Sequence, residues 1–133
     1  MSSARRDGGA AAAFADRGGG VVKRGGIAPD QQHIAAFTKC LADRGKTDGV
    51  HVNCIHPSIV ETDRTRRRIK AEIERTGRTE QDIRTDILRE FNNPIRVGTV
   101  EDVGDLVTFI VSSRATWLQG ATIDLDGGEI PVL

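Results

Sequence analysis

The stretch GVHVNCIHPSIVETD, residues 49–63, constrains the fold more than any other part of this sequence. It opens with a short run rich in valine and isoleucine that begins after Gly49 and stops at Pro57, which is typical of a strand covered on both faces of a sheet. Proline lacks a backbone N–H and therefore ends such a strand. The sequence predicts a buried strand over residues 50–56, followed by a polar loop that carries Thr62.

A helix is predicted before this strand. Pro29 and Asp30 form a favourable helix start, and apolar residues then recur at spacings of three and four. The resulting apolar stripe, which should end near residues 44–45, consists of Ile34, Phe37 and Leu41.

Two further helices are predicted after the strand, joined at Gly77 into a hairpin over residues 63–92. Thr79 and Asp82 resemble a capping box for the second helix. The apolar positions of the hairpin are Ile69, Ile73, Ile83, Ile87 and Phe91.

The carboxyl-terminal part predicts one more helix and one more strand. Thr99 and Asp102 cap the helix, and the strand at residues 121–126 alternates apolar and acidic residues before a Gly-Gly turn. A strand, helices and a strand in this order imply a right-handed parallel crossover in an α/β sheet, where ligands bind at the carboxyl ends of strands. Residues 57–63 lie at such an end. The apolar face of the last helix is expected to be Val103, Leu106, Val107 and Ile110.

The first 29 residues differ in composition from the rest. They consist largely of Gly, Ala and Arg and contain few apolar side chains. We expect residues 1–29 to be disordered or to be a non-native leader, for example a peptide produced when DNA is translated out of frame. Residues 30–133 are expected to be the folded part. The segment RGGGVVKRGG lacks the strand and the Lys-Ser/Thr pair of a phosphate loop, so a flexible linker is favoured.

Charge and composition argue against several classes of function. Nineteen basic and nineteen acidic side chains give a formal net charge of zero, so we expect no nucleic-acid partner. No stretch reaches transmembrane length, which predicts no membrane partner and a cytoplasmic location. Cys40 and Cys54 have no zinc-site spacing and suit a reducing compartment, with a disulfide less favoured.

Three segments resemble, in order and spacing, the carboxyl-terminal half of a short-chain dehydrogenase/reductase. They are AAFTKCLADRGKTDGVHVNCIHPSIVETDR, IRVGTVEDVGDLVTFIVSS and WLQGATIDLDGG, and the resemblance covers about residues 34–128. It implies a partial Rossmann-like, doubly wound parallel sheet: the last two strands with flanking helices and a helical lid. It also implies NAD or NADP as the cofactor and a small-molecule alcohol or carbonyl compound as the substrate.

The same resemblance assigns a cofactor site. In that family a Pro-Gly-x-x-x-Thr segment follows the penultimate strand and holds the nicotinamide carboxamide. The corresponding cofactor-binding residues here are Pro57, Ser58, Val60 and Thr62, and residues 63–92 correspond to the lid. Ser58 replaces the glycine, which is unfavourable if the turn requires a positive φ. The alternative is an ordinary loop in which Thr62 only caps the next helix.

No catalytic residue is assigned. The Tyr-x-x-x-Lys motif of the family counts back to Ile27 and Gln31, and the sequence contains no tyrosine. Two hypotheses stay open: an NAD(P)-dependent oxidoreductase that is inactive as this isolated chain, or a truncated, non-enzymatic remnant or oligomerisation fragment. We also expect self-association, because loss of the earlier strands of the family would leave the inner edge of residues 50–56 unpaired.

Two other clusters have a chemical and a structural interpretation. Cys54 and His56 share one face of the predicted strand, but too few ligands accompany them for a metal site, so structural roles are favoured. The basic run DRTRRRIK is followed by carboxylates four residues after Arg68 and Lys70, which favours a solvated helix face over a phosphate or RNA contact.

Overall fold

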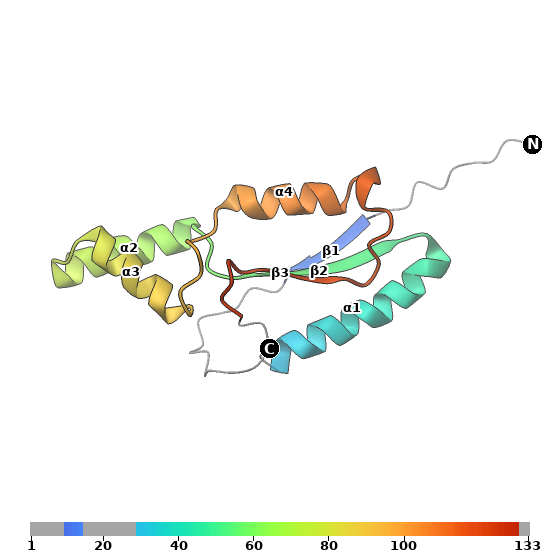
Figure 1. The fold of residues 1–133 in the computed structure, drawn as a ribbon, viewed down its shortest axis with the longest axis horizontal. Coiled ribbons are helices and arrows are strands. Elements are labelled where there is room, and N and C mark those ends of the chain that lie inside the picture. Colours follow the sequence, from blue (N-terminus) through green and yellow to red (C-terminus); the bar gives the residue numbers. More distant parts are fainter. Residues whose placement is uncertain (1–9, 15–28, 131–133) are drawn as a thin grey trace, which may run out of the picture.

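The computed structural model describes residues 10–14 and 29–130, and describes side chains from residue 33 onward. Within these residues three strands form one parallel sheet in the order β1-β2-β3. Helix α1 lies on one face of the sheet and α4 on the other, while α2 and α3 lie together beyond one end (Figure 1). The elements are β1 (Ala10–Phe14), α1 (Pro29–Asp48), β2 (His51–Pro57), α2 (Asp63–Thr76), α3 (Glu80–Glu90), α4 (Val100–Ile110), the 3₁₀ turn η1 (Ser113–Ala115) and β3 (Thr122–Leu125).

This arrangement confirms the predicted α/β class with a parallel sheet. Strand β2 is central: it pairs with β1 from Ala10 opposite His51, and with β3 from Cys54 opposite Thr122. Cys54 and Ile55 are completely inaccessible to solvent, as expected for a strand covered on both faces. The amino end of β3 is tied to β2 because Asn53 accepts a hydrogen bond from the backbone N–H of residue 121 at 2.9 Å.

The structure corrects two expectations at residues 10–14, namely that this segment is disordered and that the inner edge of residues 50–56 is unpaired. Residues 10–14 form β1 and pair with β2, so this edge is hydrogen-bonded. Scarce apolar bulk argued against an independent element, but a strand needs only the backbone groups of its neighbour. Residues 1–9 and 15–28, including the counted position Ile27, lie outside the described part of the chain.

Helix α1 also differs from its prediction. Phe37 and Leu41 are 61% and 42% exposed, so most of the predicted stripe faces away from the sheet. The buried side of the helix carries small residues at spacings of four and three, namely Thr38, Ala42 and Gly45. Helix and strand approach so closely at Gly45 that a Cβ there would lie 2.3 Å from the carbonyl oxygen of Val50. Large side chains are therefore excluded from this face.

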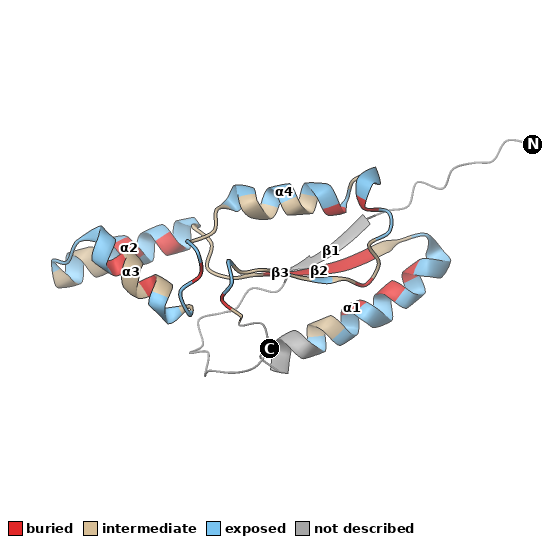
Figure 2. Cartoon of the chain, in the orientation of Figure 1, coloured by how far each residue is buried: buried red, intermediate tan, exposed pale blue. Residues whose placement is uncertain are grey.

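The two helices after β2 confirm the predicted hairpin. Helix α2 ends at Gly77, which has a φ of 68°, and Thr79 accepts a hydrogen bond from the N–H of Asp82 at the start of α3. Figure 2 shows buried residues where the two helices face each other. The apolar core between them consists of Ile69, Ile83 and Ile87, with Ile59, Ile73 and Phe91 packed against it.

Helix α4 begins as predicted, with a complete capping box between Thr99 and Asp102. On its expected apolar face Ile110 is buried, and Val103, Leu106 and Val107 are half-buried. No helix in the described part of the chain is long and apolar enough to cross a membrane.

Candidate functional site

The loop of residues 58–62 follows the carboxyl end of β2 and bends at Ile59. The N–H of Gly98 donates to the Ile59 carbonyl at 2.9 Å, and the N–H of Glu61 donates to the Gly98 carbonyl at 2.8 Å. These two bonds form a parallel bridge between Val60 and Gly98. The segment that precedes α4 therefore fixes the backbone of the loop.

This bonding pattern leaves the backbone of Val60 on the outer side of the bridge, since Gly98 bonds to the residues on either side of it. The Val60 carbonyl accepts hydrogen bonds from the N–H of Thr62 at 2.9 Å and from the hydroxyl of Thr65 at 2.8 Å. Its N–H has no partner among the described residues. Within residues 58–62, the backbone N–H groups of Ile59 and Val60 are thus the donors that have no partner among the described residues.

Ser58 fits the loop without backbone strain. Among the described non-glycine residues, positive φ angles occur only at Asn92 and Asn93, so the serine has no conformational disadvantage relative to the glycine of the family. The N–H of Ser58 donates to the Leu125 carbonyl at 3.1 Å. Its Oγ atom is buried and has no hydrogen-bond partner in the described part of the chain.

Ser58 and Val60 line a pocket of about 120 Å³ between the loop, the start of α4 and the end of β3. Pro57 and Thr62 do not line it. Pro57 is the last residue of β2, opposite Leu125 in β3. Thr62 is exposed and caps α2 by accepting a hydrogen bond from the N–H of Thr65, as the helix-cap alternative predicted. The four predicted site residues therefore lie close together along the chain, at the end of β2 and in the loop after it, but do not share one pocket.

The family model described as enoyl-(acyl carrier protein) reductase matches residues 27–129, which is more than three quarters of the chain. The chain belongs to the short-chain dehydrogenase/reductase family. An uncharacterized short-chain type dehydrogenase/reductase of Sinorhizobium fredii is 28% identical over 117 residues, covering 87% of this chain and 42% of that protein. Versicolorin reductase of Emericella nidulans is 32% identical over 96 residues, covering 71% and 36%. The chain spans less than half the length of these relatives.

Solved structures agree with this membership. L-sorbose reductase from Gluconobacter frateurii, solved with NADPH and L-sorbose, is 25% identical with a TM-score of 0.68, covering 77% of this chain and 39% of that one. A putative 2-deoxy-D-gluconate 3-dehydrogenase from Agrobacterium tumefaciens with bound NADP is 26% identical with a TM-score of 0.64, covering 92% and 46%.

Next to the pocket, an ion pair holds the residues that flank Gly98 in place. Arg96 donates two hydrogen bonds to the carboxylate of Asp102, at 2.6 and 2.7 Å. The same carboxylate accepts from the N–H of Thr99 at 2.7 Å. The Arg96 guanidinium holds the pKa of Asp102 well below its usual range, so this carboxylate is ionised at neutral pH.

Sequence reasoning missed a long-range ion pair beside the site. Arg84 in α3 donates one hydrogen bond to each carboxylate oxygen of Glu61, both at 3.1 Å, and a third to Glu80 at 2.7 Å. These bonds raise the pKa of Arg84, and the contact with Arg84 lowers the pKa of Glu61. The pair of Glu80 and Arg84 is visible in the sequence as an i,i+4 spacing, but nothing local indicates Glu61.

The alternative chemical sites are not assembled in the described part of the chain, which contains no group of three or more His, Cys, Asp or Glu residues placed to hold a metal. Cys40 and Cys54 are both free, and burial raises the pKa of the Cys54 thiol. His56 is 4% exposed, and its Nδ1 atom lies 3.3 Å from Asp124 in the neighbouring strand. These contacts agree with structural roles.

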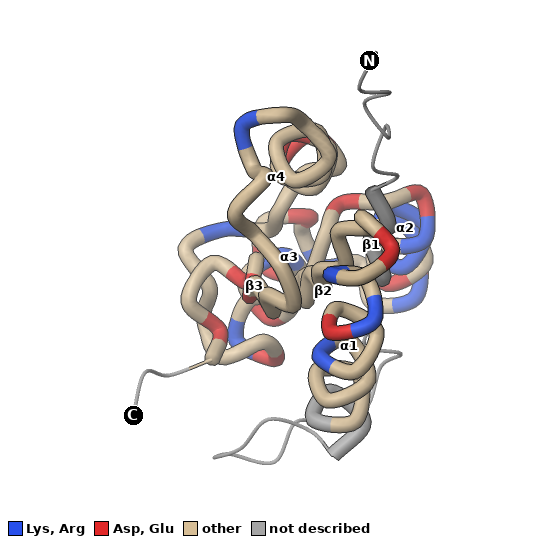
Figure 3. The backbone as a smooth tube through the Cα atoms, turned by 90° about the vertical axis from the view of Figure 1, so that its right-hand side faces the viewer, with Lys and Arg blue, Asp and Glu red and all other residues tan. Residues whose placement is uncertain are grey.

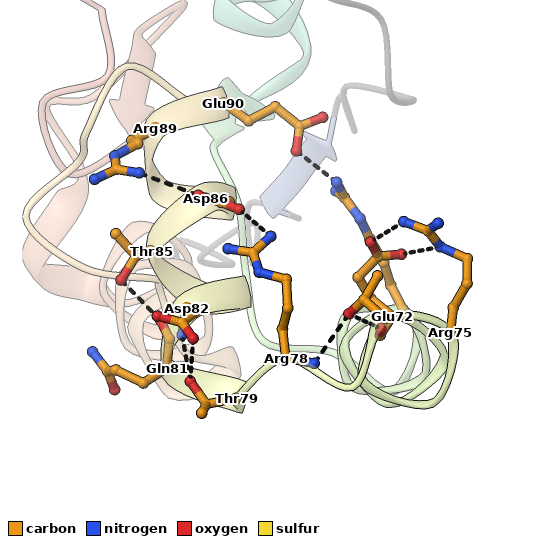
Figure 4. Close-up of polar contacts among 12 residues, drawn as sticks. Glu72, Arg75, Arg78, Thr79, Gln81, Asp82, Thr85, Asp86, Arg89 and Glu90 are labelled. Carbon is orange, nitrogen blue, oxygen red and sulfur yellow. Dashed lines mark hydrogen bonds and ion pairs between the residues drawn. The ribbon is translucent and has the colours of Figure 1, made fainter.

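The basic run in α2 pairs with carboxylates. Arg68 bonds to Glu90 of α3 instead of to Glu72, the carboxylate four residues later. The Nζ atom of Lys70 lies 4.0 Å from Oε1 of Glu74. Acidic and basic residues both occur along α1 and α2 (Figure 3). Further pairs cover the outer side of the α2–α3 hairpin (Figure 4): Arg75 with Glu72, and Arg78 and Arg89 with Asp86.

Proposed function

We propose that this chain supplies the nicotinamide end of the cofactor site in an NAD(P)-dependent oxidoreductase acting on a small-molecule alcohol or carbonyl compound. The observation that carries the proposal is the free N–H of Val60, on the loop that follows the central strand. Nicotinamide ends in a carboxamide, whose carbonyl oxygen is an acceptor for one backbone N–H. Membership of the dehydrogenase family and the nucleotides bound to its structural relatives support this choice of ligand.

Each of the four predicted site residues has a role in this proposal. Pro57 ends the strand and fixes where the loop starts, and Val60 donates its N–H to the carboxamide. Ser58 offers a buried hydroxyl beside the loop, and Thr62 holds the start of α2, the first lid helix. When bound, the nicotinamide supplies or accepts the hydride. The residues of this chain orient it.

A second candidate has an observation of its own. Ile27 and Gln31 occupy the positions counted for the tyrosine and lysine of the family, and neither side chain can donate a proton as a tyrosine does. We therefore propose that the isolated chain turns over no substrate. A non-enzymatic fragment that associates with a relative is the alternative to an enzyme subunit.

Binding of cofactor fragments separates these candidates. We expect reduced nicotinamide mononucleotide to bind weakly, with a Kd near 1 mM, corresponding to about 4 kcal/mol. Adenosine 2′,5′-bisphosphate is not expected to bind, and NADPH should bind less tightly than 1 μM, because only the nicotinamide end has a candidate partner here. Calorimetry with the three compounds measures this. Micromolar binding of the adenosine fragment contradicts the proposal.

Two substitutions at one position sharpen the test. Val60→Pro removes the N–H, which makes no bond to the described residues, and is expected to abolish binding of the mononucleotide. Val60→Ala keeps the N–H and is expected to keep most of the binding. Equal loss in both variants would show that the side chain matters and the backbone donor does not.

We also propose that the chain self-associates. Because β1 occupies the inner edge of β2, the proposed contact surface is the outer side of α1. Phe37 and Leu41 form an exposed apolar stripe beside the half-buried Ile34. Changing Phe37 and Leu41 together to glutamate is expected to shift the molecular mass, measured by light scattering, to that of a monomer. Val100→Glu on α4, which alters a residue that is 51% exposed, is the control and should not change the mass. A wild-type monomer at millimolar concentration contradicts this prediction.

A further inference from the structure

We infer that Glu61 and Arg84 are positioning residues that clamp lid helix α3 to the loop of residues 58–62, so that the lid and the backbone donor of Val60 move as one unit. This inference rests on the proposed function, because the position of the loop affects activity only if a ligand binds to the N–H of Val60. The contacts that carry it are independent of any ligand.

Glu61 is held at both its backbone and its side chain. Its N–H donates to the Gly98 carbonyl at 2.8 Å, which closes the bridge beside Val60. Its carboxylate accepts two hydrogen bonds from Arg84, and Arg66 of α2 lies 3.6 Å away. One residue therefore connects both lid helices to the segment that fixes the loop.

The ion pair is placed to resist screening by solvent. The side chains of Glu61 and Arg84 are only 29% and 28% exposed, and the two parallel bonds give the fork geometry in which arginine binds a carboxylate most strongly. Every lid ion pair between described residues that does not involve Glu61 stays within the hairpin. The pairs of Glu61 with Arg84 and Arg66 are the ones that connect the hairpin to the loop.

An apolar contact reinforces the clamp. The residues on either side of Val60 both contact the lid, Glu61 through Arg84 and Ile59 through its apolar side chain. Ile59 packs against the buried core of the lid at Ile69, Ile83 and Ile87. The side chain of Val60 instead approaches Gly98. A shift of the lid is therefore transmitted through residues 59 and 61 to the N–H between them.

Amide hydrogen exchange of the chain without ligand tests the clamp through a double-mutant cycle. Glu61→Gln and Arg84→Gln are each expected to speed exchange of the Glu61 and Gly98 amides about fivefold, while the double variant exchanges no faster than either single one. Arg89→Gln removes an exposed pair within the same helix and should leave both amides unchanged. Arg84→Lys keeps the charge without the fork and should give an intermediate rate.

Two outcomes overturn the clamp. The first is that the exchange rates of the Glu61 and Gly98 amides do not change, and the second is that the rate increases of the two single variants multiply in the double variant. If Arg84 merely stabilised α3, exchange of the Ile87 and Leu88 amides would become faster in Arg84→Gln, and the double-mutant cycle would show no coupling to Glu61. Titration with reduced nicotinamide mononucleotide then separates the two proposals. Coupling without binding contradicts only the proposed function, and binding that is equal in wild type and Glu61→Gln contradicts only the link from clamp to ligand.

Discussion

Replacing Gly45 with alanine is expected to lower the free energy of unfolding by about 2–3 kcal/mol, although alanine normally stabilises a helix relative to glycine. The new Cβ would lie 2.3 Å from the Val50 carbonyl oxygen and 2.9 Å from Nε2 of Gln119. That nitrogen donates to the carbonyls of Ala42 at 2.7 Å and Val50 at 3.0 Å. The substitution therefore forces apart the junction of α1, β2 and the segment before β3.

Gly104 provides the matched control for this prediction. It also lies in a helix, α4, but a Cβ there would meet nothing within 4 Å. Gly104→Ala is expected to raise the free energy of unfolding by about 1 kcal/mol. Urea denaturation of both variants measures the difference. A Gly45→Ala variant as stable as wild type would show that helix and strand separate easily, against the packing described above.

Replacing Ile55 with alanine should cost about 3–4 kcal/mol, a large share of the stability of a domain of this size. Ile55 is completely buried in β2, opposite Phe14 of β1 and Ile123 of β3. Removing its side chain leaves a cavity in the middle of the sheet that rigid backbone neighbours cannot close. Loss of the cooperative urea transition, or its shift to much lower urea, is the expected observation.

Leu41→Ala is the control for this cavity. Leu41 is 42% exposed, so its truncation should cost less than about 1 kcal/mol if the chain is monomeric at the concentration used. Equal losses for Ile55 and Leu41 would mean that β2 is not the centre of the core in solution.

The elements that the sequence predicted correctly are those whose signals are local. Strand β2 is bounded by Gly49 and Pro57, and α4 begins at a capping box that is four residues long. The α2–α3 hairpin combines an apolar period with a glycine at its turn. Such signals depend on backbone and neighbouring side chains alone, so no knowledge of the tertiary contacts was required.

The errors arose where a distant contact decides the outcome. The buried side of α1 is set by the close approach of Gly45 to Val50, which overrides the larger apolar residues Phe37 and Leu41. Strand β1 is an alanine run without periodicity, and only its pairing with β2 makes it a strand. Sequence patterns that cover one turn or one strand contain neither contact.

For the candidate site, family resemblance singled out a loop but gave no information about its internal arrangement. The free N–H of Val60 depends on the bridge to Gly98, which is 38 positions further along the chain. The pair of Glu61 and Arg84 joins residues 23 apart. The helix-cap role of Thr62 was visible locally and is present.

The most direct test of the nicotinamide loop is the position of amide shift changes in a ¹⁵N-labelled chain titrated with reduced nicotinamide mononucleotide. We predict saturable changes that are largest at Val60 and Glu61 and confined to residues 58–62 and their partner Gly98. The amides near Gly45 and Gln119, at the opposite end of β2, should not respond. Largest changes at that opposite end, or no change at Val60 at saturating ligand, would contradict the account.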